Sequence, residues 1–214
     1  MNDAAAKIIF EELFARYPAL ELCRCDIWAA YEALRGCFAA GGALLLCGNG
    51  GSCADCGHIA GELMKGFMLK RPLQGGKKRA LAEAGPDGAA LAAGLQGALR
   101  AIDLCAQSPI VTAVANDINP AFIYAQQVYA LGGPNDALIA ISTSGRAENV
   151  YYALVAARAA KMKRIGLTGG DGGRMAALCD VAIKAPATLT HEVQEYHLPI
   201  YHALCAMLES CFFA

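Results

Sequence analysis

Short, mainly apolar runs recur along the chain, and four of the five end at small polar residues. Five such runs occupy residues 43–47, 110–115, 137–141, 164–167 and 181–184. An uninterrupted apolar run of this length predicts a strand that is buried on both faces. Stretches with helical periodicity separate several of the runs, as at residues 147–161. Strands that alternate with helices predict an α/β fold, a three-layer α/β/α sandwich around a five-stranded parallel sheet.

The first 41 residues have a helical pattern. Apolar residues recur at helical spacing in two groups, which are Phe10, Leu13, Phe14 and Tyr17, then Ile27, Tyr31, Leu34 and Phe38. Asp3 is placed to cap the first helix, Pro18 marks its end, and Gly41 with Gly42 ends the second. We therefore expect a single domain over residues 1–214, with N-terminal helices over residues 1–41.

Residues 74–97 fit the alternating pattern less well. They are rich in glycine and alanine and include the basic run Lys77, Lys78 and Arg79. We interpret this segment as a solvated surface insertion that carries a helix of its own. An active-site lid is the alternative interpretation.

Composition narrows the classes of function. Apolar residues make up 56% of the 214 residues and charged residues only 17%. These values exclude a disordered chain and suggest that some surface is buried between subunits. A net charge of −1 gives no electrostatic basis for binding nucleic acid or an anionic membrane. No apolar run approaches the length of about 18 residues that a membrane span needs.

The chain contains ten cysteines. Charged residues among the first twenty argue against a signal peptide, so we expect a cytoplasmic protein with reduced, buried cysteines. Cys53 and Cys56 have the CxxC spacing of redox and zinc sites. No second pair and no suitably placed histidine completes this motif in the sequence, so we assign it no function.

A glycine-rich segment, residues 47–52, follows the first predicted strand and begins a predicted helix. Its glycines let a ligand approach the backbone, its free N–H groups attract an anion, and Ser52 adds a hydroxyl. A dinucleotide-binding motif is excluded, because Cys53 stands at the third glycine position. A P-loop is excluded, because no Gly-Lys-Ser/Thr is present. A tight turn without a ligand is the alternative.

A second polar loop follows the run at residues 137–141. Ser142, Thr143 and Ser144 supply three hydroxyls that can surround a phosphate together with backbone N–H groups. A helix cap with spare hydroxyls is the alternative. Arg146 is placed to pair with a phosphate or with an exposed carboxylate.

The four histidines fall in two places. His58 and Glu62 are four residues apart on a predicted helix, so they share a face and can bind a metal or share acid–base work. An ordinary surface contact is the alternative. The other three histidines belong to a polar cluster at the start of the last, apolar helix, which comprises His191, Gln194, Glu195, His197 and His202. We expect His191 and His197 to be structural or exposed.

These residues together resemble the sedoheptulose 7-phosphate isomerases, or phosphoheptose isomerases, of the sugar isomerase (SIS) family. The resemblance rests on residues 47–52, Ala54, Asp55, His58, Glu62, Leu63, Asn116, Asp117, residues 141–145, Asn149, Val150, Thr168, Gly169, Gly172, Gly173, Gln194, Glu195, His197 and His202. It covers nearly the whole chain except about 25 residues inside 74–97. Each motif is weak alone, but their combination is specific.

The resemblance implies a flavodoxin-like SIS domain that isomerises an aldose and a ketose phosphate in a homotetramer with active sites at subunit contacts. It implies an acid–base pair, Glu62 and His202. It implies substrate binding by Asn49, Gly50, Gly51, Ser52, Asn116, Asp117, Ser142, Thr143, Ser144 and Gln194, to which we add Arg146. In members that hold zinc, the ligands match His58, Glu62, Gln194 and His202. No nucleotide cofactor is expected.

Three departures from the family pattern affect the site. Ala147 stands where a hydroxyl is usual, the segment 74–97 is atypical, and Pro199 interrupts the last helix. Gln194 and His202 would lie about 12 Å apart along a straight helix, so a metal bound by both requires a kink. A non-catalytic SIS module that senses sugar phosphates or regulates a partner is the alternative function. A dinucleotide-dependent enzyme ranks third.

Overall fold

A computed structural model describes residues 3–214 of the protein. Five parallel strands form one sheet in the order β2-β1-β3-β4-β5, which is flavodoxin-like. The strands are β1 (Leu44–Gly48), β2 (Ala101–Asp103), β3 (Ala137–Ile141), β4 (Lys163–Gly169) and β5 (Val181–Ala185). Four of them coincide with the predicted apolar runs, so the predicted parallel α/β sandwich is confirmed.

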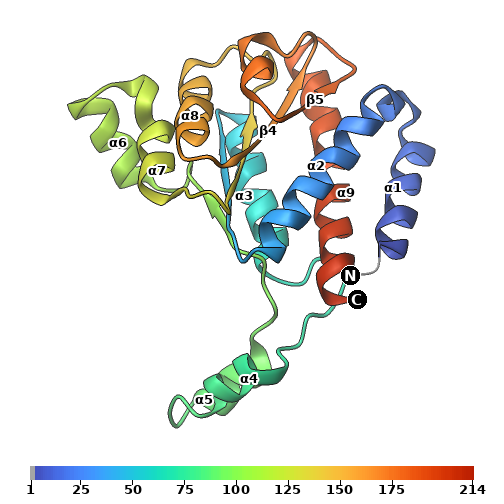
Figure 1. The fold of residues 1–214 in the computed structure, drawn as a ribbon, viewed down its shortest axis with the longest axis vertical. Helices are drawn as coiled ribbons and strands as arrows, with labels where there is room; N and C mark the ends of the chain where they lie inside the picture. The colour runs from blue at the N-terminus through green and yellow to red at the C-terminus, as the bar shows by residue number, and fades with distance from the viewer. Residues whose placement is uncertain (1–2) are drawn as a thin grey trace.

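Helices cover both faces of the sheet (Figure 1). Leu44 and Leu46 of β1 face a core formed with α1 (Ala4–Arg16), α2 (Arg24–Ala39), α3 (Gly51–Met64) and α9 (Thr190–Phe213). Leu45 and Cys47 face the opposite core, which includes residues of α7 (Ile123–Leu131) and α8 (Glu148–Ala159). The continuous apolar run in β1 therefore fills two cores at once.

The predicted strand at residues 110–115 is wrong. These residues lie inside helix α6 (Ser108–Asp117), in which only Val114 is buried. Pro109 occupies the first turn of that helix, where its missing N–H costs nothing. The fifth strand is instead β2, which pairs with β1 through Leu44 and Ala101. Asp103 ends it, and its three residues are too few to show a periodic pattern.

The N-terminal helices form as predicted, with one difference in how they begin. Phe10, Leu13 and Phe14 of α1 are buried, as are the four apolar residues predicted for α2. Asp3 stands at the N-cap of α1, but its side chain caps no backbone N–H. Its carboxylate instead accepts hydrogen bonds from Tyr31, at 2.9 Å, and from Arg35, so it joins α1 to α2. The short 3-10 helix η1 (Pro18–Cys23) connects the two.

Residues 74–97 form two short helices, α4 (Gly75–Ala82) and α5 (Gly88–Gly94), that project from the body of the domain (Figure 1). No residue of α4 is buried. The two helices pack closely on each other, since a Cβ at Gly88 would lie 2.2 Å from the carbonyl oxygen of Leu81. An isolated bridge between Pro72 and Gln96 closes the base of this hairpin.

Two further 3-10 helices, η2 (Pro120–Phe122) and η3 (Gly173–Leu178), complete the described elements, and the long C-terminal helix α9 contains Pro199. Among residues 3–214, no helix has the length and apolar character needed to cross a membrane.

Candidate active site

The two polar loops lie at the point where the strand order reverses. The glycine loop follows β1 and the hydroxyl loop follows β3, and these two strands are neighbours in the sheet. Ligands of open parallel sheets bind outside the carboxyl ends of the strands at this switch point. Gly50 has a φ of +55°, which few residues other than glycine adopt, and α3 begins at the next residue.

The hydroxyl loop packs against the loop that follows β4. Gly145 has a φ of +64°, and a Cβ there would lie 1.9 Å from the carbonyl oxygen of Gly172. Ser142 is buried and Ser144 is exposed, with its Oγ accepting the N–H of Arg146 at 3.3 Å. The loop therefore turns one hydroxyl inward and another to solvent.

A pair of side-chain amides joins the two loops. Asn49 and Asn149 exchange two hydrogen bonds of 2.9 Å each, one in each direction. Tyr124, on α7, donates a hydrogen bond to the carbonyl of Gly48 at 2.5 Å and lies 3.3 Å from Asn49 Oδ1. Neither Asn149 nor Tyr124 was assigned a role from the sequence, because their contacts join segments about 75 to 100 residues apart.

Helices α3 and α9 run side by side in the same direction. Near their starts, the Gln194 amide lies over Gly51, where a Cβ would be 2.4 Å from Nε2. About two turns later His202 Nε2 lies 3.4 Å from His58 Nε2. Glu62 follows one turn farther along α3, with Oε1 3.3 Å from His58 Nε2. The fold thus brings His58, Glu62 and His202 together and leaves Gln194 at the glycine loop.

The other ring nitrogen of His58 is held by a tyrosine. Nδ1 lies 3.0 Å from the hydroxyl of Tyr201, which donates to Asp55 Oδ1 at 3.2 Å. With its single proton directed to Asp55, the hydroxyl accepts from Nδ1–H of His58, so a neutral His58 presents a lone pair at Nε2. That lone pair faces the Glu62 carboxylate. Two acceptors at 3.3 Å require a proton or a cation between them.

His202 is held as a neutral imidazole. Burial lowers its pKa below the ordinary value, and the neighbouring His58 lowers it further. Its ring also lies 5.5 Å from the ring of Phe67. A neutral imidazole still carries one N–H, so His202 is able to donate a hydrogen bond at neutral pH.

The distances around His58 Nε2 agree in part with a metal site. Tetrahedral zinc with bonds of about 2.0–2.2 Å separates its nitrogen and oxygen ligands by about 3.3–3.6 Å, and the two measured separations are 3.4 and 3.3 Å. The remaining pair does not fit, because Glu62 Oε1 and His202 Nε2 lie more than 4.8 Å apart. Two of the three ligand pairs therefore fit zinc as they stand, and the third does not.

A buried ion pair fixes the end of α3 beside Glu62. Arg71 Nε donates to Glu209 Oε1 at 2.7 Å, and the two side chains are 0% and 1% exposed. Arg71 also donates to the carbonyls of Leu63 and Glu62, at 2.8 and 3.1 Å. No local sequence pattern indicates this pair, because its partners lie 138 residues apart.

The remaining predicted residues lie farther from this cluster. Asn116 and Asp117 are exposed at the end of α6, where Asn116 Nδ2 donates to Asp117 Oδ1 at 2.7 Å. They do not follow a strand, because the predicted strand before them is a helix. Arg146 pairs with Asp171 at 2.9 Å, and both side chains are largely exposed. We expect Arg146 to pair with a phosphate or with an exposed carboxylate, and in this structure it pairs with a carboxylate.

His191 and His197, which we expect to be structural or exposed, lie outside the cluster around His58. His191 is exposed at the start of α9. His197 is completely buried, and its Nε2 lies 3.2 Å from the carbonyl oxygen of Thr168. Burial lowers the pKa of His197 to about 4, so it is neutral at physiological pH and packs inside the protein.

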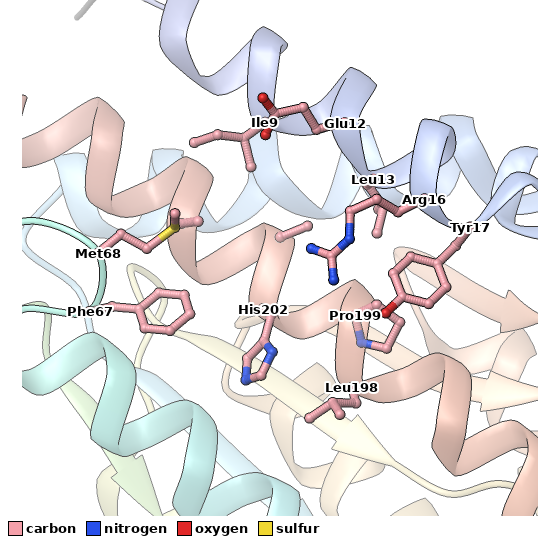
Figure 2. A pocket seen from close by; sticks show the side chains of 12 residues that line it. Ile9, Glu12, Leu13, Arg16, Tyr17, Phe67, Met68, Leu198, Pro199 and His202 are labelled. Atoms are coloured by element: carbon pink, nitrogen blue, oxygen red, sulfur yellow. The ribbon is translucent and has the colours of Figure 1, made fainter.

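His202 also lines a pocket of about 460 Å³ between α1, α9 and the segment after α3 (Figure 2). Figure 2 shows Glu12 and Arg16 of α1, with Tyr17 directly after that helix, across from Phe67 and Met68. The rest of the lining is mostly apolar, with Ile9, Leu13, Leu198, Pro199, Ala203 and Ala206. None of the glycine-loop or hydroxyl-loop residues lines this pocket.

Comparison with known proteins shows which family the chain belongs to. Residues 83–169 match the SIS domain model. The chain is 39% identical over 193 residues to the phosphoheptose isomerase of Aromatoleum aromaticum, a match that covers 89% of this chain and 85% of the relative. It is 35% identical over 206 residues to the phosphoheptose isomerase of Shewanella baltica, covering 95% and 92% of the two chains.

Solved structures give the same result. The phosphoheptose isomerase of Francisella tularensis superposes with a TM-score of 0.76 at 31% identity, and that of Neisseria gonorrhoeae with 0.74 at 32%. Each superposition covers 94% of this chain and 94% of the other. Similarity of this level over nearly the full length in both sequence and structure shows that the chain belongs to the phosphoheptose isomerase family of SIS-domain enzymes.

Proposed function

We propose that this protein interconverts sedoheptulose 7-phosphate and a D-glycero-D-manno-heptose 7-phosphate through an enediol. The observation that carries this proposal is the cluster formed by His58 and Glu62, on the helix that the glycine loop begins, with His202 of the neighbouring helix α9. A carboxylate next to an imidazole is what an aldose–ketose isomerisation requires, since the reaction moves one proton between carbons and another between oxygens.

The reaction is assigned to Glu62 and His202. Glu62 removes the proton from the carbon next to the carbonyl, and His202 donates its N–H proton to the carbonyl oxygen, which gives the cis-enediol. Glu62 then returns its proton to the former carbonyl carbon, while His202 recovers a proton from the neighbouring hydroxyl. The lowered pKa of His202 supports this role, because a neutral imidazole can both give and take a proton.

Phosphate binding is assigned to Ser52 and to the hydroxyl loop, residues 142–144. The first turn of α3 provides backbone N–H groups next to Ser52. We also assign substrate contacts to Asn49, Gly50, Gly51, Asn116, Asp117, Arg146 and Gln194. For Asn116 and Asp117, this role requires that the exposed end of α6 reach the substrate. Arg146 would exchange Asp171 for the phosphate, which the exposure of this ion pair allows.

We propose a homotetramer whose active sites lie at subunit contacts. Ser52 and Glu62 are ten residues apart on α3, a rise of about 15 Å, which favours a phosphate and an acid–base pair supplied by different subunits. Exposed apolar side chains on α1, after α3 and on α9 support such contacts, with Ile8 62%, Met68 68% and Leu198 43% exposed. All ten cysteines are free thiols, which supports a cytoplasmic location.

Zinc is a further part of the proposal. His58, Glu62 and His202 would hold the ion, with Gln194 as the fourth ligand after a rearrangement at the start of α9. When bound, the ion would polarise the substrate carbonyl. Glu62 cannot act as a base while it is fully engaged as a ligand, so metal binding and proton removal by this residue compete.

A screen of C5 to C7 sugar phosphates for ketose–aldose conversion tests the proposed function. We expect conversion to be fastest with sedoheptulose 7-phosphate and absent with the unphosphorylated sugar. Glu62→Gln serves as the matched inactive control. Tight binding of a sugar phosphate without any conversion would instead indicate a non-catalytic SIS module. Full activity after chelation would remove zinc from the mechanism.

A further inference from the structure

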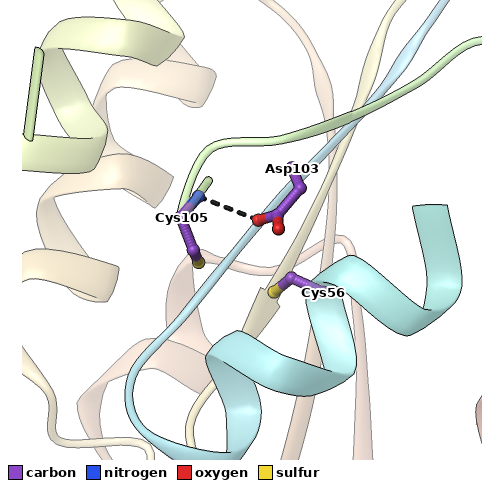
Figure 3. A group of neighbouring side chains, drawn as sticks. All are labelled: Cys56, Asp103 and Cys105. Carbon is purple, nitrogen blue, oxygen red and sulfur yellow. Dashed lines mark hydrogen bonds between the residues drawn. The ribbon is translucent and has the colours of Figure 1, made fainter. Parts of the chain in front are cut away.

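The CxxC motif of α3 is completed by residues that lie far away in the sequence. Cys56 Sγ, a carboxylate oxygen of Asp103 and Cys105 Sγ all lie within 4.8 Å of one another (Figure 3). Among the described residues, no other three histidine, cysteine or acidic side chains bring their ligand atoms this close together. The three come from α3, from the end of β2 and from the segment after it. None of them has a part in the isomerisation.

The carboxylate of Asp103 is already oriented toward α3. Its Oδ1 accepts the backbone N–H of Cys105 at 2.8 Å (Figure 3). Its Oδ2 faces α3 at Gly57, where a Cβ would lie 3.3 Å away. The first contact fixes the side chain, and the absence of a side chain at Gly57 leaves room for the second oxygen beside Cys56. Oδ2 is therefore available as a ligand.

No cation compensates this carboxylate in the part of the chain that the structure describes. The ion pairs formed by residues 3–214 do not include Asp103. Asp103 and Cys105 are half-buried, and Cys56 is completely buried. A carboxylate removed from water is stabilised when it is paired or coordinates a metal. Two thiols beside it are ligands of the kind that zinc prefers.

We propose that Cys56, Asp103 and Cys105 bind one thiophilic divalent cation of the zinc class. Tetrahedral coordination separates such ligands by about 3.3–3.8 Å, given bonds of about 2.0–2.3 Å, so the group contracts only slightly on binding. Cys53, one turn before Cys56 and in contact with Cys105, or a water fills the fourth position. Both thiols release their protons on binding. These thiols now donate to the carbonyls of Ser52, at 3.1 Å, and Gly48, at 3.3 Å.

This site is structural. Strand β2 has only three residues, pairs with β1 alone and lies at the edge of the sheet. A metal held by Asp103, Cys105 and Cys56 ties the end of this strand to α3. It also lies beside both ends of the glycine loop, through the carbonyls of Gly48 and Ser52. We therefore expect metal binding to stabilise the edge of the sheet from which α6 departs.

Cobalt titration of the chelated, reduced protein tests the site, because Co²⁺ bound by thiolate gives a charge-transfer absorption in the near ultraviolet. We expect one Co²⁺ per chain with this absorption, competed away by Zn²⁺. The absorption should be lost in Cys56→Ser and in Cys105→Ser. In Asp103→Asn, the affinity for Co²⁺ should fall at least tenfold. Cys25→Ser, which removes an exposed cysteine of α2, is the matched control and should bind as the wild type does.

Two further measurements separate this site from the metal proposed at His58. His58→Ala with His202→Ala should keep the thiolate absorption, whatever its isomerase activity. In the His58→Ala, His202→Ala background, which removes the other proposed metal site, Zn²⁺ should raise the midpoint of thermal unfolding. The added change Cys25→Ser should leave this rise as it is, and the added change Asp103→Asn should reduce it at limiting Zn²⁺. The proposal is overturned if reduced wild-type protein shows no thiolate absorption, or if the absorption persists in the Cys56→Ser, Cys105→Ser double variant.

Discussion

Arg71 and Glu209 form an ion pair that is almost completely removed from solvent, with Nε 2.7 Å from Oε1. Burial alone would raise the pKa of Glu209. The N–H groups of Phe67 and Met68, together with Arg71, outweigh this effect and lower it. The pair therefore holds the carboxylate ionised and fixes the segment that follows α3, with Glu62 at its border.

Arg71→Met should leave the buried Glu209 charge with its backbone N–H donors but without a countercharge. We expect a loss of about 3–5 kcal/mol in the free energy of unfolding, measured by urea denaturation. Arg71→Met with Glu209→Leu removes both charges and should recover part of this loss. A single variant as stable as the wild type would show that the charge of Glu209 is compensated elsewhere.

Glu62→Gln should reduce kcat by about a hundredfold or more, because the amide cannot remove the proton from carbon. The thermal unfolding midpoint and the affinity for a sugar phosphate should stay within error of the wild type. Lys65→Gln is a suitable control, since Lys65 lies 3.5 Å from Glu62 Oε2 but is exposed. Turnover of the Glu62 variant within a few-fold of wild type would exclude it as the base.

Ser52→Ala and Ser144→Ala should each raise KM for the sugar phosphate about tenfold or more, the effect of losing a hydrogen bond to a charged group. Binding of the unphosphorylated sugar should hardly change. Arg146→Ala tests whether Arg146 compensates for Ala147. If KM is unchanged in this variant but raised in the serine variants, Arg146 does not bind the phosphate and pairs only with Asp171.

Complementation tests whether active sites are shared between subunits. At substrate concentrations well below KM, the pure Glu62→Gln oligomer is expected to be nearly inactive, and the pure Ser144→Ala oligomer about tenfold less active than the wild type. Coexpression should restore a measurable fraction of activity, because some sites in mixed oligomers then contain neither substitution. Mixed oligomers without added activity would place the phosphate site and the acid–base pair in the same subunit.

The pH dependence of the free energy of unfolding should reveal the protonation of His197. Its pKa is about 4 in the folded protein and 6.5 ordinarily, so the unfolded chain takes up the proton first as pH falls. The stabilisation is complete above pH 6.5 and is lost toward pH 4, with about 1.5 kcal/mol lost between pH 6.5 and 5.

His197→Gln keeps an N–H donor for Thr168 but cannot titrate. The difference between wild type and this variant isolates His197 from His202, whose pKa is also lowered. We expect urea denaturation to give parallel stability curves above pH 7 and converging curves below it. Curves that remain parallel down to pH 5 would contradict the assignment.

The elements that the sequence predicted correctly are those with strong local patterns. The apolar run of β3 and the helical spacing of α2 require only neighbouring residues to be recognised. Strand β2 was missed because its pairing with β1, and not its own pattern, stabilises it. The run at residues 110–115 wrongly predicts a strand, because short apolar runs do not distinguish a strand from a helix.

The site shows the same division between local and distant information. The spacing of His58 and Glu62 was visible, since both lie on one helix face. The hydrogen bonds of Tyr201 to His58 and Asp55 were not, because they join residues 143 and 146 positions apart. The CxxC motif appeared incomplete for the same reason, since Cys105 reaches it only through the parallel pairing of β2 with β1.

The parallel course of α3 and α9 also shapes the electrostatic field at the glycine loop. Each helix carries roughly half a positive charge at its N-terminus, and the amide of Gln194 on α9 lies over Gly51 at the start of α3. The positive ends of two macrodipoles are therefore adjacent, while neither polar loop contains a lysine. An anion at this edge is attracted by fixed backbone charge that does not titrate, so its affinity should not depend on the ionisation of any lysine.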